Sequence, residues 1–187
     1  NVAVALGGEK RLGLTALIWT SSFCTALALY MLINWLPSLL VSKGFAKPDA
    51  SKVIMLLTLG GAASGFVFGL LSRLKARFVL YLCTWVGMAL SVAAMAQSGT
   101  EVRVAFAASF GIGFFISGGQ FLLYALATEL YPPQVRGTGV GFAVGIGRLG
   151  AVAGPLLAGG LLMAGRDTST VILAVVPLIF VALASAL

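Results

Sequence analysis

Six long apolar segments, separated by short polar stretches, make up most of the chain. A helix needs about 20 mostly apolar residues to cross the hydrocarbon core of a membrane, and each segment is close to this length or exceeds it. Transmembrane β-strands would instead alternate polar and apolar positions over about ten residues. The pattern therefore predicts an all-α protein, an integral membrane six-helix bundle. The predicted membrane-spanning segments are residues 14–41, 50–72, 78–97, 102–131, 137–164 and 169–187.

The composition agrees with a membrane protein and argues against several other classes. Hydrophobic residues make up 60% of the chain and charged residues 9%, whereas a soluble domain is about 25% charged. The formal charge of +7 is too sparse to form the basic face that nucleic acid requires. Histidine is absent from the sequence, which removes histidine-based acid–base catalysis and histidine-liganded metal sites. We therefore expect no enzyme activity, no metal or other cofactor, and no nucleic-acid partner.

The polar stretches predict the orientation of the chain in the membrane. Alternation of the six segments places the N-terminus and the stretches 73–77 and 132–136 on the same side. The sequence RLKAR at 73–77 is the densest basic cluster, and basic loops favour the cytoplasmic side. We expect residues 1–13 to be the end of a cytoplasmic linker and residues 14–187 to form the membrane unit. The chain does not begin with Met and ends within an apolar run, so we expect a piece of a longer protein.

The character of the segments repeats after the third. The first and fourth carry polar or aromatic positions at helical spacing, the second and fifth are rich in glycine, and the third and sixth are largely apolar. Because three is odd, the second set of three helices must have the opposite orientation in the membrane. The pattern therefore predicts an inverted 3+3 repeat of the kind found in transporters. Chance alternation within a six-helix bundle is the alternative.

Residues 129–160 contain a motif that resembles a known family. The sequence ELYPPQVRG fits the pattern Glu-x-Tyr/Phe-Pro-x-x-x-Arg-Gly, which is similar to the link between the tenth and eleventh helices of major facilitator superfamily transporters. The matching residues are Glu129, Tyr131, Pro132, Arg136 and Gly137.

Three further stretches extend this resemblance over nearly the whole chain. GLLSRLKAR at 69–77 is similar to the superfamily's loop between helices eight and nine, although Ser72 stands where that loop usually has Asp. NWLPSLL at 34–40 and the glycine-rich stretch 138–155, which contains an arginine, resemble the aromatic acid:proton symporter family in particular.

The resemblance implies helices seven to twelve of a twelve-helix major-facilitator fold, with a missing N-terminal six-helix half as partner. It implies a secondary active transporter in the plasma membrane, the bacterial inner membrane, surrounded by the lipid bilayer. The transported species would be a small organic anion, an aromatic carboxylate such as a benzoate-type acid, moved by proton-coupled alternating access. A porter for a sugar or other metabolite is the alternative within the superfamily. A structural or channel-like six-helix module is the alternative from another class, and the sequence does not decide between symport and antiport.

Arg148 is the charged residue that bears most directly on function. It lies about 16 Å along a helix that starts at residue 137, a depth at which an arginine costs at least about 2.5–3.5 kcal/mol to insert. It shares a helix face with Gly141 and Gly145, so a neighbouring helix or a cavity can come close. We predict that Arg148 binds a substrate carboxylate, whose planar geometry suits a guanidinium. The alternative is a structural arginine that bonds helix carbonyls or extends to the membrane interface.

Polar residues of the first and fourth segments are predicted to line the same cavity as Arg148. Buried amides in a membrane need partners, so hydrogen bonding between helices is the alternative role. The predicted substrate-binding residues in addition to Arg148 are Gln120, Tyr124 and Ser117 from the fourth segment, and Tyr30 and Asn34 from the first.

Charged residues at one end of the bundle are predicted to form a cytoplasmic gate. Glu129 lies at the C-terminal end of a helix, where the helix dipole disfavours an anion, and a nearby cation would offset this. The superfamily resemblance implies a latch that holds the outward-facing state. A solvated ion pair worth less than about 1 kcal/mol is the alternative. The predicted gate residues are Arg73, Arg77, Glu129 and Arg136.

Proton coupling requires a titratable group within the membrane that is linked to substrate binding. The acidic residues of the chain lie in loops or at a helix end, and histidine is absent. We therefore expect the principal proton-binding carboxylate to lie in the N-terminal half. The acidic residues concerned are Glu9, Asp49, Glu101, Glu129 and Asp167.

Overall fold

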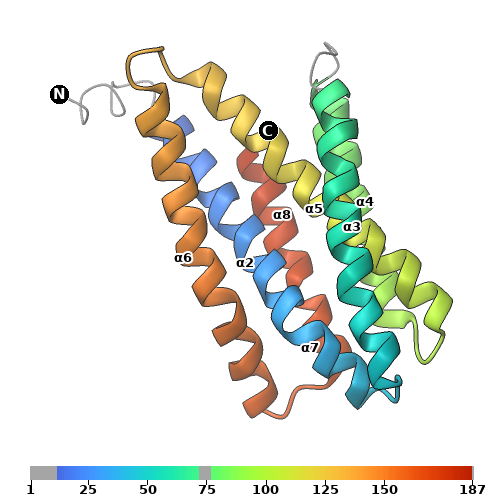
Figure 1. Ribbon diagram of the computed structural model, residues 1–187. Coiled ribbons are helices and arrows are strands. Elements are labelled where there is room, and N and C mark those ends of the chain that lie inside the picture. Colours follow the sequence, from blue (N-terminus) through green and yellow to red (C-terminus); the bar gives the residue numbers. More distant parts are fainter. Residues whose placement is uncertain (1–11, 72–76, 187) are drawn as a thin grey trace.

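The structure is a computed structural model, and it describes residues 12–71 and 77–186 (Figure 1). Every regular element in these ranges is a helix, and six helical segments are long and apolar enough to cross a membrane. This confirms the predicted all-α fold with six membrane-spanning segments. The helices are α2 (Leu12–Ser42), α3 (Lys47–Leu71), α4 (Arg77–Gln97), α5 (Val102–Leu130), α6 (Arg136–Met163), α7 (Thr168–Leu173) and α8 (Val175–Ala186).

The last predicted segment differs from the prediction because it is divided into α7 and α8 at Ala174. Pro177 explains the division. Proline has no N–H to donate to the carbonyl of Leu173, four residues earlier, and its ring crowds that carbonyl. The two helices together still form one apolar stretch of membrane length, Thr168–Ser185.

The helices pack as two equivalent pairs, α2 against α6 and α3 against α5. The first helices of the two three-helix sets, α2 and α5, run in opposite directions (Figure 1). The outer helices follow the same rule, since α4 packs on α5 and α8 packs on α2. Exchanging the two sets therefore reproduces the helix contacts, as expected for the predicted inverted 3+3 repeat.

Glycines allow both helix pairs to approach closely at equivalent places. A Cβ atom on Gly150 of α6 would clash with the carbonyl oxygen of Phe23 in α2. A Cβ atom on Gly60 of α3 would clash in the same way with the carbonyl oxygen of Phe110 in α5. Gly154 repeats the contact with α2 one turn after Gly150. The glycine-rich character of the second and fifth segments therefore serves close packing between helices.

Apolar side chains fill most of the interior of the bundle, but a space remains beside α6. Large side chains such as Met31, Leu36 and Ile112 are fully buried between α2, α5 and their neighbours. α6, in contrast, lies tightly against α2 but contacts α5 only sparsely. This leaves space between α2, α5 and α6, and the candidate site occupies it.

Candidate binding site

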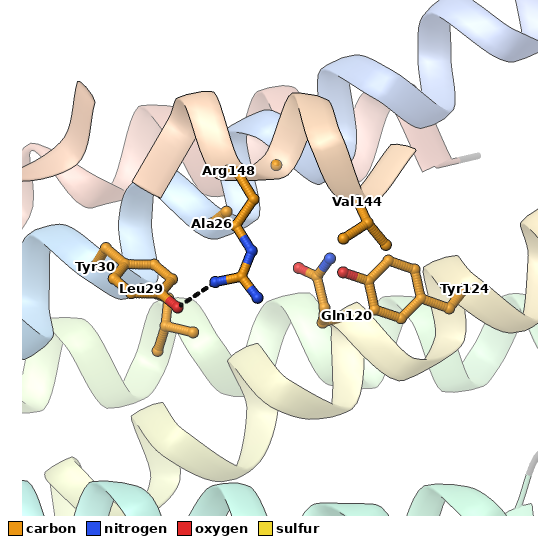
Figure 2. Close-up of a pocket in the computed structure, with 8 residues that line it drawn as sticks. Ala26, Leu29, Tyr30, Gln120, Tyr124, Val144 and Arg148 are labelled. Atoms are coloured by element: carbon orange, nitrogen blue, oxygen red, sulfur yellow. Dashed lines mark hydrogen bonds between the residues drawn. The ribbon is translucent and has the colours of Figure 1, made fainter. Parts of the chain in front are cut away.

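A pocket of about 180 Å³ lies where α2, α5 and α6 meet (Figure 2). An apolar cavity of about 150 Å³ is enough to bind a benzene ring. The pocket therefore has room for one aromatic ring with small substituents. Its lining residues are Ala26, Leu29 and Tyr30 of α2, Gln120 and Tyr124 of α5, and Val144, Gly147 and Arg148 of α6.

Arg148 reaches the pocket because Gly150, two residues later, lets α6 lie close to α2. Gly147 is buried, and a Cβ atom there would contact the carbonyl of Ser22 and the side chain of Ala26. From this position the guanidinium of Arg148 extends into the pocket, where its Nη1 donates a hydrogen bond to the Tyr30 hydroxyl at 3.3 Å (Figure 2). A guanidinium has five N–H donors. Most of them remain available to a ligand.

The pocket carries a positive charge without a compensating carboxylate in the described part of the chain. Arg148 is the charged residue among those that line it. The ion pair found among the described residues is between Lys52 and Asp49, at the start of α3. A charge inside a membrane is expensive and normally faces a water-filled cavity or pairs with an opposite charge. The arrangement therefore favours an anionic ligand, or a carboxylate supplied from outside the described residues.

Gln120 and Tyr124 present polar groups to the pocket from the other side. They are one helical turn apart on α5, and both side chains are partly exposed. The Tyr124 hydroxyl and the Gln120 amide point toward the guanidinium of Arg148 (Figure 2). Within the described ranges, neither side chain is engaged in a hydrogen bond. Together they can offer an amide carbonyl, an amide N–H₂ and a phenolic O–H to a ligand.

Two other predicted binding residues do not line this pocket. Ser117 of α5 points to α3, where a Cβ atom on Gly61 would lie 2.8 Å from its Oγ. The Nδ2 atom of Asn34 donates to the carbonyl of Tyr30 in its own helix, at 2.8 Å. Neither side chain is therefore among the lining residues, and their contact with a substrate stays a prediction.

The apolar part of the lining was not identified from the sequence. Ala26 precedes Tyr30 by about one turn, and Val144 precedes Arg148 by the same spacing, so helical periodicity is the signal that could have found these two. Leu29 is the residue next to Tyr30 in the sequence, and periodicity does not single it out. The glycines that let α6 approach α2 are Gly150 and Gly154, rather than Gly141 and Gly145 on the predicted face. A Cβ atom on Gly141 or Gly145 would have nothing within 4 Å in the described chain.

The predicted gate is only partly within the described residues. Arg73 and the side chain of Arg77 lie outside them. Glu129 is exposed at the end of α5, and Arg136 begins α6, where its Nε donates to the carbonyl of Tyr131 at 3.4 Å. The buried Tyr131 hydroxyl donates to Oγ1 of Thr15 at 3.1 Å and so ties this end of α5 to α2. A latch formed by the charged residues stays a prediction.

Comparison with known proteins shows one family over nearly the whole chain. The sequence profile of the Major Facilitator Superfamily matches residues 18–187. The 3-(3-hydroxy-phenyl)propionate transporter of Escherichia coli is 43% identical over 168 residues, which cover 90% of this chain and 41% of that protein.

Two more distant relatives have similar coverage. The benzoate transport protein of Acinetobacter baylyi is 33% identical over 156 residues, covering 82% of this chain and 33% of the relative. The gallate transporter of Pseudomonas putida is 33% identical over 154 residues, covering 81% and 34%. The chain thus spans less than half the length of the curated relatives that it matches.

Proposed function

This chain belongs to the major facilitator superfamily, and we propose that it forms the C-terminal half of a transporter for a small aromatic carboxylate. The family and the six membrane-length segments make it a multi-pass membrane protein, and the relatives named above are transporters rather than enzymes. The proposal includes a bacterial inner-membrane location, a cytoplasmic N-terminus and a six-helix N-terminal half that closes the pocket.

The placement of Arg148 is the observation that carries this proposal. Its guanidinium faces a ring-sized pocket and has no carboxylate partner among the described residues. A guanidinium binds a carboxylate through two parallel hydrogen bonds. The Tyr30 hydroxyl accepts one bond from Arg148, so its own proton is free to reach the same carboxylate. Leu29 and Val144 add apolar side chains to the lining, which suits an aromatic ring.

The names of the relatives support the same ligand class. Two are named for benzoate and gallate, which are aromatic carboxylates, and one is named for an acid that joins a hydroxylated phenyl ring to a carboxylate. A neutral sugar would leave the charge of Arg148 uncompensated in the membrane. The pocket therefore supports an organic anion better than it supports a sugar.

We assign the proton-binding carboxylate of the coupled transporter to the N-terminal half. The pocket lining contributes a cation and neutral groups. Asp49, Glu101, Glu129 and Asp167 lie at helix ends or in the connections between helices. This half would supply the cationic anchor, and the gate residues Arg73, Arg77, Glu129 and Arg136 would close the cytoplasmic side during alternating access.

Uptake of radiolabelled benzoate by the full-length protein in proteoliposomes tests the proposal. Arg148→Ala should abolish uptake, and Arg148→Lys should restore little of it, because a point charge replaces a two-pronged donor. Arg166→Ala is the matched control, since Arg166 is exposed in the connection between α6 and α7.

The amount of folded protein, measured by size-exclusion chromatography, separates binding from structure. Full uptake by Arg148→Ala would contradict the proposal. Loss of folded protein in parallel with loss of uptake would instead identify Arg148 as a structural arginine.

A further inference from the structure

The polar side chains of the pocket form two chemically different groups on opposite sides. Tyr30 and Arg148 form a cationic side, joined by their hydrogen bond. Gln120 and Tyr124 form a neutral side, with polar ends that face the first group across the pocket (Figure 2). A carboxylate satisfies the cationic side. A carboxylate alone does not account for the amide of Gln120 and the phenol of Tyr124 on the other side of the pocket.

We propose that Gln120 and Tyr124 recognise a hydroxyl group on the aromatic ring, so that the transporter selects hydroxylated aromatic acids over unsubstituted ones. This inference rests on the proposed function, because it takes Arg148 as the anchor for the carboxylate. It adds a second contact at the other end of the ring, made by side chains of α5 rather than α2 and α6.

The chemistry of the two side chains matches a phenolic hydroxyl. A phenolic hydroxyl has one donor and acceptor lone pairs. The amide carbonyl of Gln120 can accept its proton, and the Tyr124 hydroxyl can donate to its oxygen. The spacing of four residues on α5 places both groups on one face of the helix, as a two-point contact requires.

The same pair disfavours a ring that lacks the hydroxyl. When a ligand fills the pocket, water is displaced from the Gln120 amide and the Tyr124 hydroxyl. A plain ring leaves both groups without partners, and an unpaired buried polar group is unfavourable. Sites built to bond a substrate hydroxyl reject the analogue without it for this reason. Neutral hydrogen bonds formed in competition with water predict a preference of roughly 3- to 10-fold.

Dissociation constants of the full-length protein for benzoate, 3-hydroxybenzoate and 4-hydroxybenzoate test this inference. The wild type should bind at least one hydroxylated acid roughly 3- to 10-fold more tightly than benzoate. Tyr124→Phe and Gln120→Leu should bring the ratio of the dissociation constants to about one, because each removes a partner of the ring hydroxyl.

Two tyrosine substitutions serve as matched controls. Tyr30→Phe acts on the carboxylate side, so it should weaken binding of all three acids and leave their ratio unchanged. Tyr81→Phe removes a hydroxyl that donates to the carbonyl of Leu122 in the core, outside the pocket, and should leave the ratio unchanged as well.

The outcomes separate this inference from the proposed function. A wild type that binds benzoate and the hydroxylated acids equally overturns the inference and leaves the proposed function in place. The same conclusion follows if Tyr124→Phe weakens binding of all three acids by the same factor. Gln120 and Tyr124 would then contact the carboxylate or stabilise the fold, rather than recognise the ring hydroxyl. A wild type that binds none of the acids overturns both.

Discussion

Replacing Gly150 by alanine should loosen the contact between α2 and α6 that positions Arg148. The added Cβ atom would overlap the carbonyl oxygen of Phe23 and lie 3.1 Å from the backbone nitrogen of Leu27. Both atoms belong to the backbone of a long helix, so neither can move aside as a flexible side chain would. The strain therefore has to be relieved by moving α6 away from α2.

The size of the effect follows from the packing. A displacement of about 0.5–1 Å forfeits a quarter to a half of each dispersion contact along the interface. An extra methyl group in a packed interior costs about 1–3 kcal/mol, and replacing a helical glycine by alanine returns up to about 1 kcal/mol. We expect Gly150→Ala to lower the free energy of unfolding by about 1–2 kcal/mol.

Gly160 provides the control on the same helix, because a Cβ atom there has nothing within 4 Å. Gly160→Ala should be neutral or stabilise by up to about 1 kcal/mol. The assay is denaturant unfolding of the full-length protein in detergent micelles, combined with the dissociation constant for benzoate. Gly150→Ala should also weaken benzoate binding, because it displaces Arg148. Equal stability of the two variants would refute the packing argument.

Three other predictions concern charged residues of this half. The carboxylate of Asp167 caps α7 by accepting hydrogen bonds from Thr170 and Ser169, and the bond from the Thr170 hydroxyl in particular lowers the pKa of Asp167. The cap therefore stabilises the fold above the ordinary carboxylate pKa, and this stabilisation is lost as the pH falls through the lowered pKa. On acidification, the melting temperature of Asp167→Ala should therefore fall less than that of the wild type. Glu129→Lys should shift the transporter toward inward-facing states, and adding Arg136→Glu should partly reverse the shift, as measured by the accessibility of cysteines from the periplasmic side. Unchanged accessibility in the single and the double variant would rule out the latch. Neutralising each acidic residue of this half singly should leave proton-driven uptake intact, and loss of driven uptake with substrate exchange retained would place the coupling site here.

The helical segments could be predicted because length and apolar character suffice to identify them. The break at Ala174 was missed, although Pro177 is a visible signal for it. The sequence also predicted that Arg148, Gln120 and Tyr124 line one pocket, because a charge in an apolar helix needs a cavity or a partner and a polar stripe at helical spacing marks one helix face. Their contact with a substrate stays a prediction.

Side-chain spacing predicts which residues share a face of one helix, but not how that face is rotated relative to neighbouring helices. Ser117 precedes Gln120 by three residues on α5, yet it faces Gly61 of α3 rather than the pocket. Asn34 follows Tyr30 by four residues and bonds to the carbonyl of that residue. The placement of Ser117 and Asn34 depends on contacts between helices, which cannot be predicted from the spacing of residues in a single sequence.

The inverted repeat separates the helix packing that supports the candidate site from the side chains that line it. In the first copy, Tyr30 lies seven residues after Phe23, and Arg148 lies two residues before Gly150. In the second copy, Ser117 lies seven residues after Phe110, and Thr58 lies two residues before Gly60. Since these glycines meet these phenylalanines in the same way, Thr58 and Ser117 are the repeat equivalents of Arg148 and Tyr30. The Thr58 hydroxyl donates to the carbonyl of Ile54 in its own helix, at 2.7 Å. One close helix contact therefore carries a cation and a phenol, while its equivalent carries two short hydroxyls. The glycine contact is common to both copies, so the proposed binding of an anion would come from the long polar side chains that only the first copy places beside it.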